Sequence, residues 1–284
     1  MLNAVGREIP EEILERTGKE VFQGNNYKDG KAFQKASPKV TPVMRNDHDK
    51  MVKDIHEALV KCNAHDGMTV SFHHHLRNGD YVLNLVMEEV ARLGIRDLTV
   101  NASSLFDIHL PLLDHIQSHV VTGIQTDYMS AALGREISRG AMEKPVQFRT
   151  HGGRPRDIAL GRTPIDVAFI AAPAADPMGN CSGKYGKSAC GSLGYAYPDA
   201  MYAKKVVVIT DNLVDYPLLD WSIPESYVDY VVCVEEIGNP KGIVSGTTQI
   251  TRDPVGLVMA QNAAKVIQYS GLLKEGFSFQ TGAG

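Results

Sequence analysis

Short apolar runs alternate with longer segments that carry an apolar residue at every third or fourth position. The runs are typical of strands buried on both faces, and the longer segments are typical of amphipathic helices. Such alternation predicts an α/β fold with a mostly parallel, Rossmann-like sheet and helices on both faces. The predicted strands are 68–72, 98–102, 120–125, 146–149, 167–171, 205–210 and 228–234, and the predicted helices are 47–65, 81–93, 109–119, 127–139 and 254–273.

Residues 1–45 lack this alternation. Glycines and prolines interrupt them, and the stretch 19–39 is strongly polar. Such a segment is typical of irregular structure on a surface or on a partner. We therefore predict an extended N-terminal arm over 1–45, followed by one α/β domain over 46–275.

The end of the chain, 276–284, has a pattern of its own. Residues 277–280 alternate like the start of a strand and run into Thr281, Gly282, Ala283 and Gly284. A glycine turn after a strand normally leads to a helix whose amide groups face an anion. The segment is either a frayed tail or the start of a second α/β domain that this chain lacks, and we favour the second interpretation.

The composition excludes some classes of protein. The formal net charge of the 284 residues is −4, which does not favour binding to nucleic acid. No apolar run is long enough to span a membrane, so we expect no membrane segment. The four cysteines have no CxxC spacing, which argues against a zinc or redox pair and favours a reduced, cytoplasmic setting.

The first candidate site is the loop Ser71–Gly79 after the first predicted strand. Its backbone N–H groups, with the charges of His74 and Arg77, suit a phosphate or carboxylate, and Asn78 and Gly79 suit a tight turn. Three consecutive histidines cannot all face one ion, because neighbouring side chains on extended backbone point in opposite directions. We therefore predict contact with an anionic substrate and no metal site, with a merely polar loop as the alternative.

A second candidate is the loop His151–Arg156, whose glycines allow a ligand close to the backbone. Arg154 or Arg156 can form a bidentate pair with a carboxylate or phosphate. The alternative is a glycine-rich surface turn with solvated arginines, and the sequence does not decide between them.

The third candidate is the polar end of Asp166–Gly183, where Gly179 and Asn180 follow a buried strand. Ligands of open α/β sheets bind at the carboxyl ends of strands, although Asp176 and Asn180 equally suit hydrogen bonds within their own loop. Cys181 is more typical of a buried cysteine than of a nucleophile. Neither GxxxxGK[ST] nor GxGxxG is present, which disfavours nucleotide-binding classes. Adjacent Glu235 and Glu236 are more typical of a solvated strand end than of a catalytic pair.

Five segments together resemble the citrate lyase α subunit family of the CoA-transferase superfamily. They are Met1–Pro10, Ser71–Asp80, Phe148–Pro155, Asp176–Gly183 and Gly276–Gly284. The resemblance runs along the whole chain and implies the CoA-transferase fold.

The resemblance also implies an activity. Citrate would replace the acetyl group on a carrier-protein thioester, giving citryl-carrier and acetate in citrate fermentation. A β subunit would then cleave the citryl thioester. The thiol would belong to a phosphoribosyl-dephospho-CoA group on the γ acyl carrier subunit, so this chain itself would bind no cofactor. A homo-oligomer within the complex is also implied.

Family members are about twice as long, so the resemblance implies that this chain is the first of two similar halves. The catalytic carboxylate is then expected in the missing half, and we assign it to no residue here. Substrate contacts are implied for His74, Arg77, Asn78, Gly79, Arg154, Gly179, Asn180, Gly282 and Gly284.

Two other functions remain open. The superfamily includes proteins that bind small molecules or phosphosugars without transferase activity. A third possibility is a scaffold in which residues 1–45 dock other subunits and this half contributes no chemistry.

Overall fold

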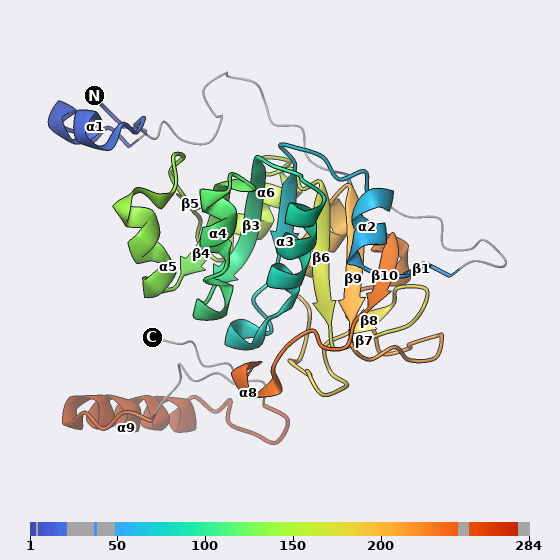
Figure 1. Ribbon diagram of the computed structural model, residues 1–284. Coiled ribbons are helices and arrows are strands. Elements are labelled where there is room, and N and C mark those ends of the chain that lie inside the picture. Colours follow the sequence, from blue (N-terminus) through green and yellow to red (C-terminus); the bar gives the residue numbers. More distant parts are fainter. Residues whose placement is uncertain (4, 22–36, 39–48, 244–249, 278–284) are drawn as a thin grey trace. The chain divides into compact units, whose positions relative to one another are not determined.

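Eight strands form one sheet in which every neighbouring pair is parallel (Figure 1). The computed structural model describes residues 1–3, 5–21, 37–38, 49–243 and 250–277. The order across the sheet is β1-β10-β9-β6-β2-β3-β4-β5, which confirms the predicted mostly parallel α/β fold. The strands are β1 Met51–Val52, β2 Thr69–Phe72, β3 Leu98–Leu105, β4 Val121–Met129, β5 Gln147–Phe148, β6 Val167–Ala172, β9 Lys205–Thr210 and β10 Tyr230–Cys233.

Helices cover both faces of this sheet. Alternate residues of β6 belong to two separate hydrophobic cores, with Phe169 in the first and Ile170 in the second. This is the period of two that a strand buried on both faces requires. The first core contains α2 Ile55–Lys61, α3 Val82–Arg92 and α4 Leu112–Gln117, which lie in front of the sheet in Figure 1. The second contains α6 Gly153–Ala159 and α7 Tyr197–Tyr202.

The strand order reverses between β2 and β6. From β2 the chain proceeds outward through β3, β4 and β5, and from β6 it proceeds the other way through β9 and β10. In open α/β sheets the loops diverge at such a point and leave a crevice at the carboxyl ends of the strands. The fold therefore places the segment after β2 at the position where a ligand is expected.

The other elements are short, except for α9. An antiparallel hairpin follows β6, and among the described residues no helix is long and apolar enough to cross a membrane. These elements are α1 Glu11–Thr17, the 3₁₀ turn η2 Arg77–Gly79, α5 Ala131–Glu136, β7 Ala174–Ala175, β8 Cys181–Ser182, α8 Pro240–Ile243 and α9 Pro254–Tyr269.

The N-terminal arm predicted as extended contains a helix, α1, so that prediction was wrong for these residues. The helix begins after Pro10, has Glu11 and Glu12 in its first turn, and ends at Gly18 in the left-handed conformation. Each feature favours a helix end, because carboxylates suit the N-terminus and glycine accepts a positive φ. The signals were present in the sequence, but the many surrounding glycines and prolines obscured them.

Two predicted helices begin too early. Met51 and Val52 form a strand against β10, and α2 starts only after Asp54, whose carboxylate accepts the Glu57 N–H. Similarly, β4 continues to Met129, and α5 starts after Ser130. In both places pairing with a neighbouring strand outweighs the local helical spacing.

The contacts divide the chain into two units, Met1–Ile243 and Val244–Gly284. In the second unit, α9 confirms a helix within the predicted range 254–273. The domain predicted over 46–275 runs across this division. Most of the segment predicted to start a further domain, including Gly282 and Gly284, lies outside the described residues.

Replacement of Phe169 by alanine should destabilise the first unit by about 3–5 kcal/mol. Phe169 is 1% exposed, and its ring stacks on Phe72 with 5.6 Å between the centroids. Phe148→Ala is the matched control, because Phe148 lies on the edge strand and is 61% exposed, so its loss should cost less than about 0.5 kcal/mol. Urea unfolding followed by circular dichroism measures both values, and equal losses would contradict this account of the core.

Candidate functional site

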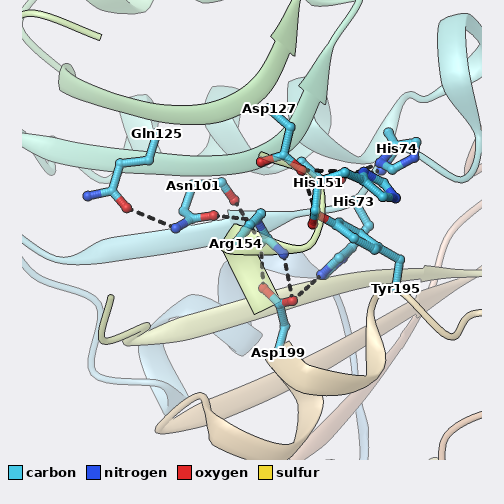
Figure 2. Close-up of polar contacts among 10 residues, drawn as sticks. His73, His74, Asn101, Gln125, Asp127, His151, Arg154, Tyr195 and Asp199 are labelled. Atoms are coloured by element: carbon cyan, nitrogen blue, oxygen red, sulfur yellow. Dashed lines mark hydrogen bonds and ion pairs between the residues drawn. The ribbon is translucent and has the colours of Figure 1, made fainter. Parts of the chain in front are cut away.

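A network of polar side chains lies across β2, β3 and β4 near the point of strand reversal (Figure 2). His73 and His74 directly follow β2, Asn101 is in β3, and Asp127 is in β4. Helices α6 and α7 bring Arg154 and Asp199 to the same place. The site therefore draws on five elements that are far apart in the sequence.

The centre of the network is an ion pair between Arg154 and Asp199. Arg154 Nη1 and Nη2 donate to the two oxygens of Asp199 at 2.9 and 2.6 Å, and Nε donates to Asn101 Oδ1 at 2.7 Å. Arg154 is 1% exposed and Asp199 is fully buried. Burial alone would raise the pKa of Asp199, but Arg154 and then His73 outweigh it and hold that pKa well below its ordinary value of 3.8. Both charges are thus retained in the interior.

Arg154 was predicted to bind a carboxylate of the substrate. The structure gives its guanidinium a carboxylate from the chain itself, so Arg154 positions α6 against α7 and β3. Substrate contact by Arg154 stays a prediction. The sequence could not supply this partner, since Asp199 lies 45 residues away.

His73 is buried beside the same carboxylate. Its Nε2 lies 3.1 Å from Asp199 Oδ2, which is an ion-pair distance, although the ring is not aligned for a hydrogen bond. Its Nδ1 has no hydrogen-bond partner among the described residues. His73 therefore faces the ion pair, whereas His74, the next residue, faces the other way into the site (Figure 2).

His74 lies among groups that can carry positive charge. Its Nδ1 is 2.6 Å from Ser103 Oγ, and its ring centroid is 5.5 Å from that of His151. Burial, followed by the nearby His75, His151, His73 and Arg77, lowers the pKa of His74 to about 3. His74 is consequently neutral near pH 7, in surroundings that disfavour another cation and favour an anion.

Tyr195 and His151 form the opposite wall. Their rings stack with 4.2 Å between centroids and an interplanar angle of 10°. The Tyr195 hydroxyl contacts Asp127 Oδ2 and the His151 carbonyl oxygen, the latter at 2.7 Å. Sequence reasoning placed His151 at the start of the second candidate loop without giving it a role, and it did not select Tyr195 or Asp127. Asp127 lies close to the end of a predicted strand but was assigned to a helix.

The loop after β2 contains the other predicted residues. Arg77 has a positive φ of 52°, is half-buried, and its side chain has no partner among the described residues. Asn78 is exposed and accepts a hydrogen bond from the Ile108 N–H at 3.1 Å. Gly79 packs against α8, where an added Cβ would lie 2.4 Å from the Asn239 carbonyl oxygen. Arg77 is therefore the free cation of this loop, and ligand contact by Asn78 and Gly79 stays a prediction.

Gly179 and Asn180 belong to a loop held by Asp176. The Asp176 carboxylate accepts N–H groups of Met178, Gly179 and Asn180, and Asn180 Nδ2 donates to it at 2.9 Å. These bonds support the interpretation in which Asp176 and Asn180 form hydrogen bonds within their own loop. No hydrogen bond or ring contact in the described part of the chain joins Gly179 or Asn180 to His74, so their substrate contact stays a prediction.

Two further candidates gain no support. Cys181 is fully buried, and burial raises the pKa of its thiol, which makes it a poor nucleophile. Glu236 is exposed and lies 3.7 Å from Lys187, as expected of a solvated ion pair. Within the described ranges, no group of three or more His, Cys, Asp or Glu side chains could hold a metal ion.

The fold and the sequence both place the chain in a known family. The fold is that of the CoA-transferases: an acyl-CoA transferase from Escherichia coli O157:H7 matches with a TM-score of 0.55 over 78% of this chain and 55% of its own, at 13% identity. Residues 48–284 match the family described as "Citrate lyase, alpha subunit". The chain therefore belongs to the citrate lyase α subunit family.

Individual relatives agree. The chain is 47% identical to the citrate lyase alpha chain of Klebsiella pneumoniae over 83% of this chain and 46% of the relative. It is 46% identical to the alpha chain of Escherichia coli K12 over 89% of this chain and 50% of the relative. A Streptococcus mutans structure, described as an alpha subunit of citrate lyase in complex with citrate, is 48% identical, with a TM-score of 0.81 over 99% of this chain and 54% of its own. The chain thus spans about half the length of these relatives.

Asp199→Asn should destabilise the protein by about 3–5 kcal/mol, because it leaves the buried Arg154 charge uncompensated. Asp220→Asn is the matched control, since Asp220 pairs with Lys184 at the surface and its loss should cost less than about 1 kcal/mol. Urea unfolding at neutral pH measures both.

The stability difference between Asp199→Asn and the parent should depend on pH. Because the folded-state pKa of Asp199 is lowered, its contribution is complete above the ordinary value of 3.8 and is lost as the pH falls below it. The difference between Asp199→Asn and the parent should therefore shrink in acid, and a constant difference would contradict the ion pair.

Proposed function

We propose that this chain provides one wall of the site at which citrate replaces the acetyl group of an acetyl-carrier thioester, giving citryl-carrier and acetate. The observation that carries the proposal is the group of histidines and Arg77 around neutral His74, at the carboxyl ends of the central strands. Membership of the citrate lyase α subunit family supports the choice of citrate.

The electrostatics of the site suit a polycarboxylate. Arg77 offers a guanidinium that no described side chain engages, and a carboxylate pairs with it in bidentate geometry. Neutral His74 can donate a hydrogen bond without taking up a second proton, and the exposed His151 ring offers a further N–H.

Arg154 has a different part in the proposed site. Its charge is offset by Asp199, so it adds little attraction for an anion at the surface. It instead holds α6 in place, and therefore the backbone of His151, two residues before the helix. Arg77 is accordingly the stronger candidate for the direct contact with citrate.

The proposed reaction needs groups from outside this chain. We assign the β subunit, which would cleave the citryl thioester, and the γ acyl carrier subunit as its partners in a cytoplasmic complex with more than one copy of this chain. The phosphoribosyl-dephospho-CoA group of the γ subunit would supply the thiol. We assign the catalytic carboxylate to no residue here and expect it from the part of the family's length that this chain does not span.

No observation favours a phosphosugar-binding module or a scaffold over this function. Arg154 is already paired with Asp199, and the loop after β2 places Gly79 against α8 instead of leaving its backbone open to a phosphate.

Arg77→Gln should weaken citrate binding by about ten- to a hundredfold, because it removes a charge-assisted hydrogen bond worth roughly 1.5–3 kcal/mol. Isothermal titration calorimetry of the 284-residue chain measures the affinity. Arg92→Gln is the matched control, because Arg92 lies on the exposed face of α3 and pairs with Glu88 and Glu89. Equal citrate affinities of the two variants would show that Arg77 does not contact citrate.

The chain by itself should form little citryl-carrier from acetyl-carrier and citrate, since half of the family's length is missing from it. A radiolabelled citrate assay with the γ subunit measures this, and the control is a family member of full length under the same conditions. Comparable rates from the two proteins would show that this chain holds the complete catalytic site.

A further inference from the structure

Tyr195 joins the two histidines of the site to the ion pair beneath them. It directly follows the Gly- and Ser-rich segment 182–194 and lies two residues before the start of α7. Its ring centroid lies 4.2 Å from that of His151, 5.3 Å from that of His74, and 5.7 Å from the Arg154 guanidinium carbon. Figure 2 shows the Tyr195 ring against these side chains.

The hydroxyl adds a second kind of contact. It lies at hydrogen-bond distance from Asp127 Oδ2 and from the His151 carbonyl oxygen. Burial raises the pKa of Tyr195, and so does Asp127, so the phenol keeps its proton and remains a donor. A half-buried tyrosine with a satisfied hydroxyl has few free rotamers, which makes its ring a rigid surface.

The histidines depend on this surface for their orientation. His151 has an exposed side chain and lies 3.5 Å from Asp127 through Nδ1, a weak restraint for an exposed ring. His74 is fixed on one side by Ser103, and its other ring contacts among the described residues are with His151 and Tyr195. Removal of Tyr195 would therefore leave His151 unsupported and His74 open to water.

We infer that Tyr195 is a positioning residue of the anion site, which holds His74 and His151 as a pair and shields His74 from water. The inference rests on the proposed function only for the identity of the ligand, citrate. Because Tyr195 directly follows the Gly- and Ser-rich segment 182–194, the end of that segment lies at the proposed binding wall.

Two substitutions separate the contributions of Tyr195. Tyr195→Phe keeps the ring and removes the hydroxyl, and Tyr195→Leu removes the ring as well. Tyr197→Phe and Tyr197→Leu are the matched controls, because Tyr197 lies in the same turn but packs edge-on against Tyr227 at 5.7 Å, away from the site. Any general loosening of α7 should appear equally in the controls.

The first measurement is the protonation of His74, by NMR of the imidazole nitrogens in protein labelled at histidine, with His74→Gln to assign the signal. In the parent, His74 should not titrate above pH 4, as its pKa is about 3. The groups that can carry charge around it are His73, His75, Arg77 and His151, and Asp127 and Arg154 contact Tyr195.

Tyr195→Leu admits water and should move the pKa of His74 up toward its ordinary value of 6.5, whereas Tyr195→Phe and both controls should leave it low.

The second measurement is citrate affinity by calorimetry. Tyr195→Phe should weaken binding about fivefold and Tyr195→Leu about tenfold or more, while the Tyr197 variants bind like the parent. If Tyr195→Leu does not fold, the pKa of Asp127 in Tyr195→Phe provides the test. The Tyr195 hydroxyl lowers the pKa of Asp127 through its hydrogen bond, so loss of the hydroxyl should raise this pKa, which NMR of the carboxyl carbon measures.

The outcomes are distinct. Unchanged affinity in Tyr195→Phe, or equal effects of the leucine variants at 195 and 197 on His74, would overturn the role of Tyr195. A parent chain that does not bind citrate would instead overturn the proposed function, and the titration of His74 would still decide the role of Tyr195.

Discussion

The buried ion pair of Arg154 and Asp199 is the interaction on which the rest of the site depends. Removing either charge leaves the other in a medium that solvates it poorly, so the two side chains must stay together. Their hydrogen bonds join α6, α7 and β3, and His73 connects β2 to the same carboxylate. One contact thus fixes the relative positions of four elements that surround the crevice.

The electrostatic character of the crevice follows from this arrangement. Arg154 neutralises the negative charge of Asp199 in the interior. His74, His151 and Arg77 lie on the side of the network nearer to the surface. Low-dielectric surroundings keep His74 neutral, and its neighbours would make any added cation costly. Arg77, which no described side chain engages, and neutral His74 suit the carboxylate ligand that we propose for this site.

The position of the crevice is a property of the sheet. Since β2 and β6 are adjacent and the chain leaves them in opposite directions, the loops after these strands separate. The loop after β2 carries the histidines, whereas the loop after β6 folds back into the β7–β8 hairpin around Asp176. The two loops therefore differ in kind: one presents polar side chains, and the other satisfies its own backbone.

The sequence by itself determined the fold class and most strands. Alternating apolar residues such as Phe169 and Ile170 define two buried faces, and that pattern is local, so it can be read without the structure. The sequence also selected His74 and Arg77 as candidates, because a polar loop after a buried strand is a local signal. It did not identify the partner of Arg154, or any role for Tyr195, His151 and Asp127. Only the tertiary structure decided these, because the hydrogen bonds of Arg154 to Asp199 and of the Tyr195 hydroxyl join residues from 44 to 68 positions apart, and such contacts leave no periodic pattern in the chain.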